Sequence, residues 1–155
     1  CLNSATAALE LTLHVLKIGP GDEVITSAYT YTASASPVIH VGAKLVLVDT
    51  ALDSYEMDYD KLADAITEKT KAIIPVDIAG IPCDYDKIFA IVKAKQKLFH
   101  AGNNKIQQAL NRIIVVTDGA HAFGANWHGK MVGDIADFTS FSFLEHKFMT
   151  TEQVA

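Results

Sequence analysis

Short apolar segments alternate with segments of helical spacing along most of this chain, and that alternation constrains its fold more than any other feature. Four segments, EVITS, KLVLVD, AIIPVD and IIVVTD, have the length and the β-branched content of buried strands. Strands of this kind, separated by helices, are typical of a parallel sheet that is covered on both faces. We therefore expect an α/β fold in which a mostly parallel sheet lies between layers of helices.

Residues that begin or end helices set the boundaries of the expected elements. The GPG sequence at 19–21 ends the first helix, and Asp58 or Asp60 is the expected N-cap of a later one. Pro37 is expected to break the second helix or to stand beside its start, and the polar stretch 100–112 is expected to be a surface insertion. Helices are expected at about 5–17, 31–42, 58–66 and 84–99, and strands at about 23–27, 44–49, 72–77, 113–118 and 136–143.

The composition is that of an ordinary folded domain. The 155 residues are enough for one domain with a buried core, and half of them are hydrophobic. A net charge of −5 provides no broad basic surface, so we do not expect nucleic acid as a partner. Two cysteines are too few for a disulfide framework, which favours a cytoplasmic protein, and no apolar run approaches the roughly 20 residues that span a membrane.

The two ends of the chain carry no pattern that begins or ends a protein. The first residue is Cys1 rather than Met, and Ala155 follows no terminating pattern. We therefore expect residues 1–155 to be a single partial domain of a longer protein.

Two polar features stand where the carboxyl ends of parallel strands gather, and ligands bind at that edge in sheets of this kind. The small residues NSAT at 3–6 open a helix whose free amides and positive dipole end suit a phosphate, although a plain N-cap is the simpler interpretation. Asp118 ends the strand IIVVTD, where a buried carboxylate needs a cation or several hydrogen-bond donors. Capping of the following turn is the alternative for Asp118.

An aromatic pair and a lysine complete the set of candidates. Tyr29 and Tyr31 stand beside a strand end and offer a flat face to a planar ligand, unless they belong to the core. Lys147 follows the Phe-rich strand segment FTSFSF. A lysine that is partly removed from water has a lowered pKa and can attack aldehydes as a neutral amine, whereas the default interpretation is a surface lysine.

Together these features match the needs of a pyridoxal 5'-phosphate (PLP) site. Such a site needs an amine for the aldehyde, a carboxylate for the ring nitrogen, a flat partner for the ring and a cradle for the phosphate. The competing motifs GxGxxG after the first strand, GxxxxGK[ST] and GxSxG are absent. His121, His128 and His146 match no familiar set of metal ligands, so no metal is expected.

Ordered sequence blocks from Leu2 to about Thr151 resemble the DegT/StrS family of PLP-dependent sugar aminotransferases, which have the aspartate aminotransferase fold (fold type I). The blocks are NSATAALELTL, GPGDEVITSAYTYTASASPVIHVGAKLVLVD, TKAIIPVDIAGIPCD, DGAHAFGANWHGKMVGDIADF and FSFLEHK. Their order and spacing are specific for the fold and the cofactor, and much less so for the substrate. The resemblance implies that the chain is part of the large PLP-binding domain, without the small C-terminal domain.

The resemblance also implies roles for residues around the cofactor ring. Lys147 would carry the cofactor covalently and move a proton between a substrate carbon and a cofactor carbon. Asp118 would pair with the ring nitrogen, and Tyr31 would stack on the ring. His121 occupies a position that the family fills with Gln or His beside the ring and its phenolic oxygen.

Ala5, Thr6 and Ser142 are the residues that the resemblance implies for the phosphate. The usual reaction of the family transfers an amino group from glutamate to a keto group on a nucleotide-linked sugar, in two half-reactions. The resemblance therefore implies a cytoplasmic homodimer that acts in polysaccharide or amino-sugar biosynthesis.

The sequence around Lys147 departs from the family's pattern, which commonly has HAxKN around the lysine and EGG shortly after it. Here LEH precedes Lys147 and Phe148 follows it. One alternative is therefore a truncated or inactive fragment, or a regulatory relative. Another is a PLP-dependent sugar dehydratase, although the lysine is typically replaced in those enzymes and is present here.

Overall fold

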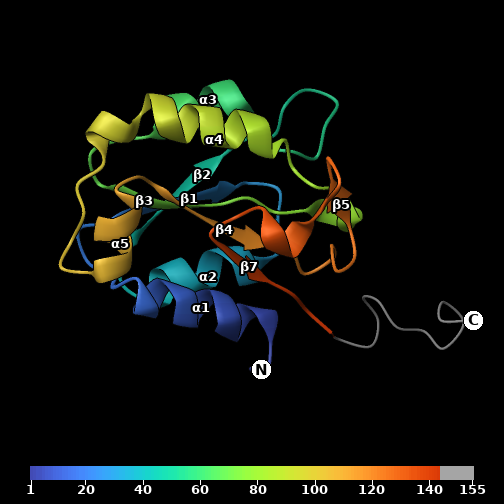
Figure 1. Cartoon of the computed structure of the whole chain (residues 1–155), viewed down its shortest axis with the longest axis horizontal. Coiled ribbons are helices and arrows are strands. Elements are labelled where there is room, and N and C mark those ends of the chain that lie inside the picture. The colour runs from blue at the N-terminus through green and yellow to red at the C-terminus, as the bar shows by residue number, and fades with distance from the viewer. Residues whose placement is uncertain (144–155) are drawn as a thin grey trace, which may run out of the picture.

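The computed structural model describes residues 1–143, and its central feature is a five-stranded sheet (Figure 1). The strands are β1 (Glu23–Ser27), β2 (Lys44–Val48), β3 (Thr70–Ile74), β4 (Ile114–Asp118) and β7 (Phe138–Ser140). Their order is β2-β1-β3-β4-β7, and every neighbouring pair is parallel. The expected α/β fold with a mostly parallel sheet is confirmed, whereas Lys147 lies outside the described residues.

Helices cover both faces of the sheet, with α1 and α2 on one face and α3 and α4 on the other (Figure 1). The helices are α1 (Ala5–Val15), α2 (Thr32–His40), α3 (Tyr59–Ala65), α4 (Tyr85–Ala94) and α5 (Lys105–Leu110). Three short 3₁₀ turns are η1 (Ile78–Gly80), η2 (Gln96–Leu98) and η3 (Val132–Asp134). A small hairpin is formed by β5 (Asn126–Trp127) and β6 (Lys130–Met131). Asp58 is the N-cap of α3, because its side chain accepts hydrogen bonds from two amides of the first turn. Within residues 1–143, no helix combines the length and the apolar character needed to cross a membrane.

Two apolar clusters, one on each face, hold the helices to the sheet. Successive side chains of a strand point to opposite faces, and the central strands follow this rule. Ile73 and Val115 belong to the cluster beneath α3 and α4, whereas Ala72 and Ile114 belong to the cluster beneath α1 and α2. Burial on both faces is why these strands are apolar at successive positions.

Pro37 does not break the second helix, so that prediction was wrong. Helix α2 runs from Thr32 to His40 with Pro37 inside it. The turn after the proline still closes, because the Val41 amide donates to the Pro37 carbonyl at 3.1 Å. Val38, the next residue, is fully buried in the cluster beneath α1 and α2, and this packing holds the helix across the missing proline hydrogen bond.

The last strand is shorter than the sequence predicts. Strand β7 covers Phe138–Ser140 rather than 136–143. Before it, the Asp137 carboxylate accepts hydrogen bonds from the Arg112 guanidinium and from the Val115 amide. After it, Phe141 leaves the sheet and packs edge-to-face on Phe123, with ring centroids 5.5 Å apart.

The polar stretch 100–112 contains a packed helix, so its prediction as a surface insertion was wrong. It contains α5, and two polar residues of this helix are buried: its N-cap, Asn104, and Gln107. The side-chain amides of Asn104 and Gln107 donate to the carbonyls of Val15 and Leu16, each at 2.7 Å. These two carbonyls end α1 and have no partner within the helix, so the polar residues of α5 satisfy them.

Replacing Gln107 with Ala is expected to lower the free energy of unfolding by about 1–3 kcal/mol, because the buried Leu16 carbonyl loses its donor. Urea unfolding of the purified protein measures this change. Gln108 is the matched control, since it lies one residue away and is exposed. Gln108→Ala should change stability by less than about 0.5 kcal/mol, and equal effects of the two variants would contradict the assigned role of Gln107.

Candidate functional site

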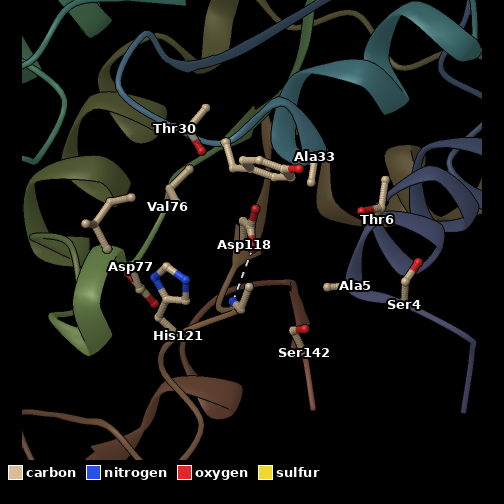
Figure 2. A pocket seen from close by; sticks show the side chains of 13 residues that line it. Ser4, Ala5, Thr6, Thr30, Ala33, Val76, Asp77, Asp118, His121 and Ser142 are labelled. Atoms are coloured by element: carbon tan, nitrogen blue, oxygen red, sulfur yellow. Dashed lines mark hydrogen bonds between the residues drawn. The ribbon is translucent and has the colours of Figure 1, made fainter. Parts of the chain in front are cut away.

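A pocket of about 590 Å³, part of which is open to solvent, lies at the carboxyl ends of the central strands. Its lining residues come from the start of α1, the start of α2 and the segments that follow β3, β4 and β7: Ser4, Ala5, Thr6, Thr30, Tyr31, Ala33, Val76, Asp77, Ile78, Asp118, Ala120, His121 and Ser142. Figure 2 shows these side chains converging from separate parts of the chain. The structure thus brings together the residues that the family resemblance implies for the cofactor, apart from Lys147, whereas the other candidate tyrosine, Tyr29, does not line the pocket.

Asp118 is the last residue of β4 and is 5% exposed. The Ser34 hydroxyl in α2 donates to Oδ2 at 2.6 Å, and the Ala120 amide donates to Oδ1 at 3.1 Å. The Thr30 hydroxyl lies 2.7 Å from that of Ser34 and extends the chain of hydrogen bonds. Each carboxylate oxygen has a further lone pair, so Asp118 can accept an N–H group from a ligand in the pocket.

The start of α1 forms another wall of the pocket. Ser4 is its N-cap, and the Ser4 hydroxyl accepts a hydrogen bond from the Ala7 amide at 3.1 Å. The amides of Ala5 and Thr6 lie in the first turn, where a helix offers no internal carbonyl partner. The Ser140 hydroxyl donates to the Ala5 carbonyl at 2.9 Å and so fixes the helix start against β7.

The two predicted tyrosines have different surroundings. Tyr31 lines the pocket and is 77% exposed, so its ring is free to contact a ligand. Tyr29 instead stacks on Tyr55, with ring centroids 5.4 Å apart and an interplanar angle of 25°. Of the two rings, Tyr31 is the one at the site, and Ser142, which is buried, lines the pocket from the segment after β7.

Asp77 also lines the pocket but is not among the residues that the sequence predicts. It is 1% exposed; the Cys83 amide donates to Oδ1 at 2.9 Å, and the Tyr85 hydroxyl lies 3.0 Å from Oδ1 and 2.9 Å from Oδ2. Burial raises the pKa of Asp77 to about 6, against the opposing effect of these hydrogen bonds. The sequence does carry a signal for it: AIIPVD ends in Asp just as IIVVTD does, and the carboxyl ends of parallel strands meet at one edge.

The turn formed by residues 77–83 separates Asp77 from α4 and contains strained backbone. Ala79 has φ of 54° and Gly80 has φ of 78°, both in the left-handed region. For Ala this conformation costs roughly 1–2 kcal/mol, and a Cβ on Gly80 would lie 3.0 Å from the His121 carbonyl oxygen. The bond from the Cys83 amide to the Asp77 carboxyl, worth about 1.5–3 kcal/mol when the acceptor is charged, closes the turn and offsets this strain.

His121 lies on the other side of that turn. Its Nδ1 is 3.3 Å from the Ala79 amide, which donates to it. In the view of Figure 2, the His121 ring and Asp77 lie on one side of Asp118, and Ala5 and Thr6 lie on the other. The pocket therefore has an open helix start at one end, a carboxylate in the middle and an imidazole at the opposite end.

Replacing Asp77 with Asn is expected to remove a pH-dependent part of the stability. Because the folded protein raises the pKa of Asp77, this carboxyl stabilises the fold most below about pH 4, and the stabilisation is lost as the pH rises through about 6. The unfolding free energy of the wild type should thus fall relative to Asp77→Asn over this range, by on the order of 3 kcal/mol. Denaturant unfolding of the cofactor-free protein at several pH values measures the difference.

Asp64 provides the control, since Asp64→Asn makes the same chemical change at an exposed position. Parallel pH curves for the wild type and Asp77→Asn would contradict the raised pKa of Asp77.

Comparison with known proteins identifies the family. The sequence matches the model of the DegT/DnrJ/EryC1/StrS aminotransferase family over residues 1–101 and 103–153. A Streptococcus pneumoniae protein named as a sugar aminotransferase, solved in apo, PMP and PLP forms, is 60% identical with a TM-score of 0.94, and the match covers 98% of this chain and 38% of that one.

Two relatives known from sequence give the same result. An uncharacterized protein of Methanocaldococcus jannaschii is 42% identical over 97% of this chain and 35% of its own length. The GDP-perosamine synthase of Caulobacter vibrioides is 39% identical over 96% of this chain and 36% of its own length. The chain therefore spans little more than a third of these relatives, and it belongs to the DegT/DnrJ/EryC1/StrS aminotransferase family.

Proposed function

We propose that the protein is a PLP-dependent aminotransferase that transfers an amino group from glutamate to the keto group of a nucleotide-linked sugar. The family match and the PLP and PMP forms of the Streptococcus pneumoniae relative support the cofactor. The name of the Caulobacter vibrioides relative, a GDP-perosamine synthase, favours a nucleotide-linked substrate. Amino-sugar or cell-surface polysaccharide biosynthesis is the corresponding role.

The observation that carries this proposal is the position of Asp118. Its carboxylate is buried at the bottom of the pocket, held by Ser34 and Ala120, and it still has lone pairs for one more N–H group. Such an acceptor keeps a proton on a pyridine nitrogen. Bound PLP supplies an electron sink at the reacting carbon, and that sink is effective when the ring nitrogen is protonated.

The end of the pocket formed by the start of α1 suits a phosphate. The free amides of Ala5 and Thr6 and the positive end of the α1 dipole favour an anion at this position. Ser142 is buried and lines the same pocket, where its hydroxyl can donate another hydrogen bond. We assign these three residues to the phosphate of PLP.

The remaining assignments concern the ring and its covalent attachment. The exposed ring of Tyr31 would stack on the cofactor ring, and His121 would donate to its phenolic oxygen. Lys147 would hold the cofactor through its aldehyde and would serve as the group that moves a proton at the reacting carbon. The assignment of Lys147 rests on the family resemblance of FSFLEHK, since this residue lies outside the described structure.

We further propose that the chain is part of the large cofactor-binding domain of a cytoplasmic homodimer. The described sheet and its helix layers form one domain (Figure 1), and the pocket lies at the carboxyl ends of its strands. The relatives are nearly three times as long as the matched region, which leaves room for a second domain in proteins of this family.

Replacing Lys147 with Ala is expected to abolish trapping of PLP by borohydride, because this reagent fixes the cofactor only where an amine has condensed with its aldehyde. Mass spectrometry of the reduced protein measures the added cofactor. Lys130, an exposed lysine on β6, provides the control variant Lys130→Ala, which should be labelled like the wild type. Labelling that survives in Lys147→Ala would remove Lys147 from this role.

Replacing Asp118 with Asn is expected to leave PLP attached but to slow amino transfer by about 10²-fold or more, because an amide cannot hold the ring-nitrogen proton as a carboxylate does. The measurement is formation of an amino sugar from glutamate and a nucleotide-linked keto sugar. Ser34→Ala, which removes only one donor to Asp118, should have a smaller effect.

The same measurement separates the alternatives. If the wild-type protein removes water from the sugar and forms no new amine, it is a dehydratase. A wild-type protein that binds PLP and turns over neither substrate would be the inactive or regulatory relative.

A further inference from the structure

His121 is exposed, and the contact at its Nδ1 favours one position for the ring proton. The Ala79 amide is 3.3 Å from Nδ1, and a backbone amide can only donate a hydrogen bond. Nδ1 must therefore be an unprotonated acceptor, and a neutral imidazole in this position carries its proton on Nε2. His121 lines the pocket, so this tautomer makes it a hydrogen-bond donor toward an acceptor oxygen there.

The position of the Ala79 amide depends on the left-handed turn of residues 77–83. Two backbone bonds close parts of the turn: the Gly80 amide donates to the Asp77 carbonyl at 3.3 Å, and the Ile81 amide donates to the Ile78 carbonyl at 3.0 Å. The bond from the Cys83 amide to Asp77 Oδ1, at 2.9 Å, joins the first residue of the turn to its last. The Asp77 side chain therefore reinforces the left-handed backbone at Ala79 and Gly80, because its bond closes the whole turn around the local backbone bonds.

Asp77 is itself held in one orientation. The Tyr85 hydroxyl contacts both carboxyl oxygens and lies 2.9 Å from the Thr117 hydroxyl on β4. Asp77, Tyr85 and Thr117 are all buried, so these polar groups have no water to exchange with. The turn is thus tied to the sheet through a buried chain of hydrogen bonds.

We propose that Asp77 is a positioning residue: by closing the turn of residues 77–83, it holds the Ala79 amide on Nδ1 of His121 and keeps the His121 proton on Nε2. The tautomer is a property of the cofactor-free protein, so this part is independent of the proposed function. The identity of the acceptor oxygen as the phenolic oxygen of PLP rests on the proposed function.

The test is nitrogen NMR of the purified, cofactor-free protein with ¹⁵N-labelled histidine, at a pH where ordinary histidines are neutral. His121 is assigned by the signal that His121→Gln removes. The wild type should show the separated pair of nitrogen shifts of an Nε2–H imidazole. Asp77→Asn should keep this pattern, because an amide oxygen still accepts from the Cys83 amide. Asp77→Ala should move the two shifts toward each other as both tautomers become populated.

Asp137→Ala is the matched control, since Asp137 is a half-buried carboxyl that is likewise held by hydrogen bonds, from a guanidinium and an amide, but lies outside the turn. It should leave the His121 shifts unchanged. If Asp77→Ala does not fold, Tyr85→Phe, which removes the hydroxyl that orients Asp77, should give a smaller change in the same direction. An Nδ1–H pattern in the wild type, or a wild-type pattern in both Asp77→Ala and Tyr85→Phe, would overturn the proposal whether or not the protein binds PLP.

Discussion

The parallel pairing between β4 and the segment that follows β3 is the constraint on which the site depends. The Asp118 amide donates to the Pro75 carbonyl at 2.9 Å, and the Asp77 amide donates to the Asp118 carbonyl at 3.1 Å. This register places Val76 opposite Asp118, so Asp77 is one residue further along. Because side chains alternate along a strand, Asp77 and Asp118 point toward opposite faces of the sheet.

Two aspartates at neighbouring strand ends therefore have different environments. Asp118 points toward α2, where the Ser34 hydroxyl meets it, whereas Asp77 points toward α4, where it is enclosed with Tyr85. Burial, and to a lesser extent the charge of Asp118, raises the pKa of Asp77. Environment rather than residue type thus distinguishes Asp118, the proposed acceptor for a ligand, from Asp77, which accepts from the protein's own backbone.

The sequence predicts the layers and much of the site because both follow from local patterns. A few consecutive residues are enough to predict the apolar strands, the position of Asp118 at a strand end and the start of α1. Gln107 differs, because its polar side chain is buried by a hydrogen bond to Leu16, 91 positions away. The continuation of α2 across Pro37 likewise depends on the tertiary packing of Val38. Contacts with residues that are distant in the sequence cannot be predicted from a single segment.

The charges in the pocket favour a ligand that is anionic at one end and carries an N–H group in its middle. The start of α1 supplies only about half of a positive charge, so the hydrogen-bond donors of Ala5, Thr6 and Ser142 must contribute to holding a phosphate. Asp118 supplies the acceptor for the N–H group. His121 lines the same pocket, and its Nδ1 accepts a hydrogen bond from the Ala79 amide. The left-handed turn of residues 77–83 thus bears on the pocket through this contact, because an Nδ1 that accepts from the Ala79 amide leaves Nε2 as the imidazole nitrogen available to a ligand.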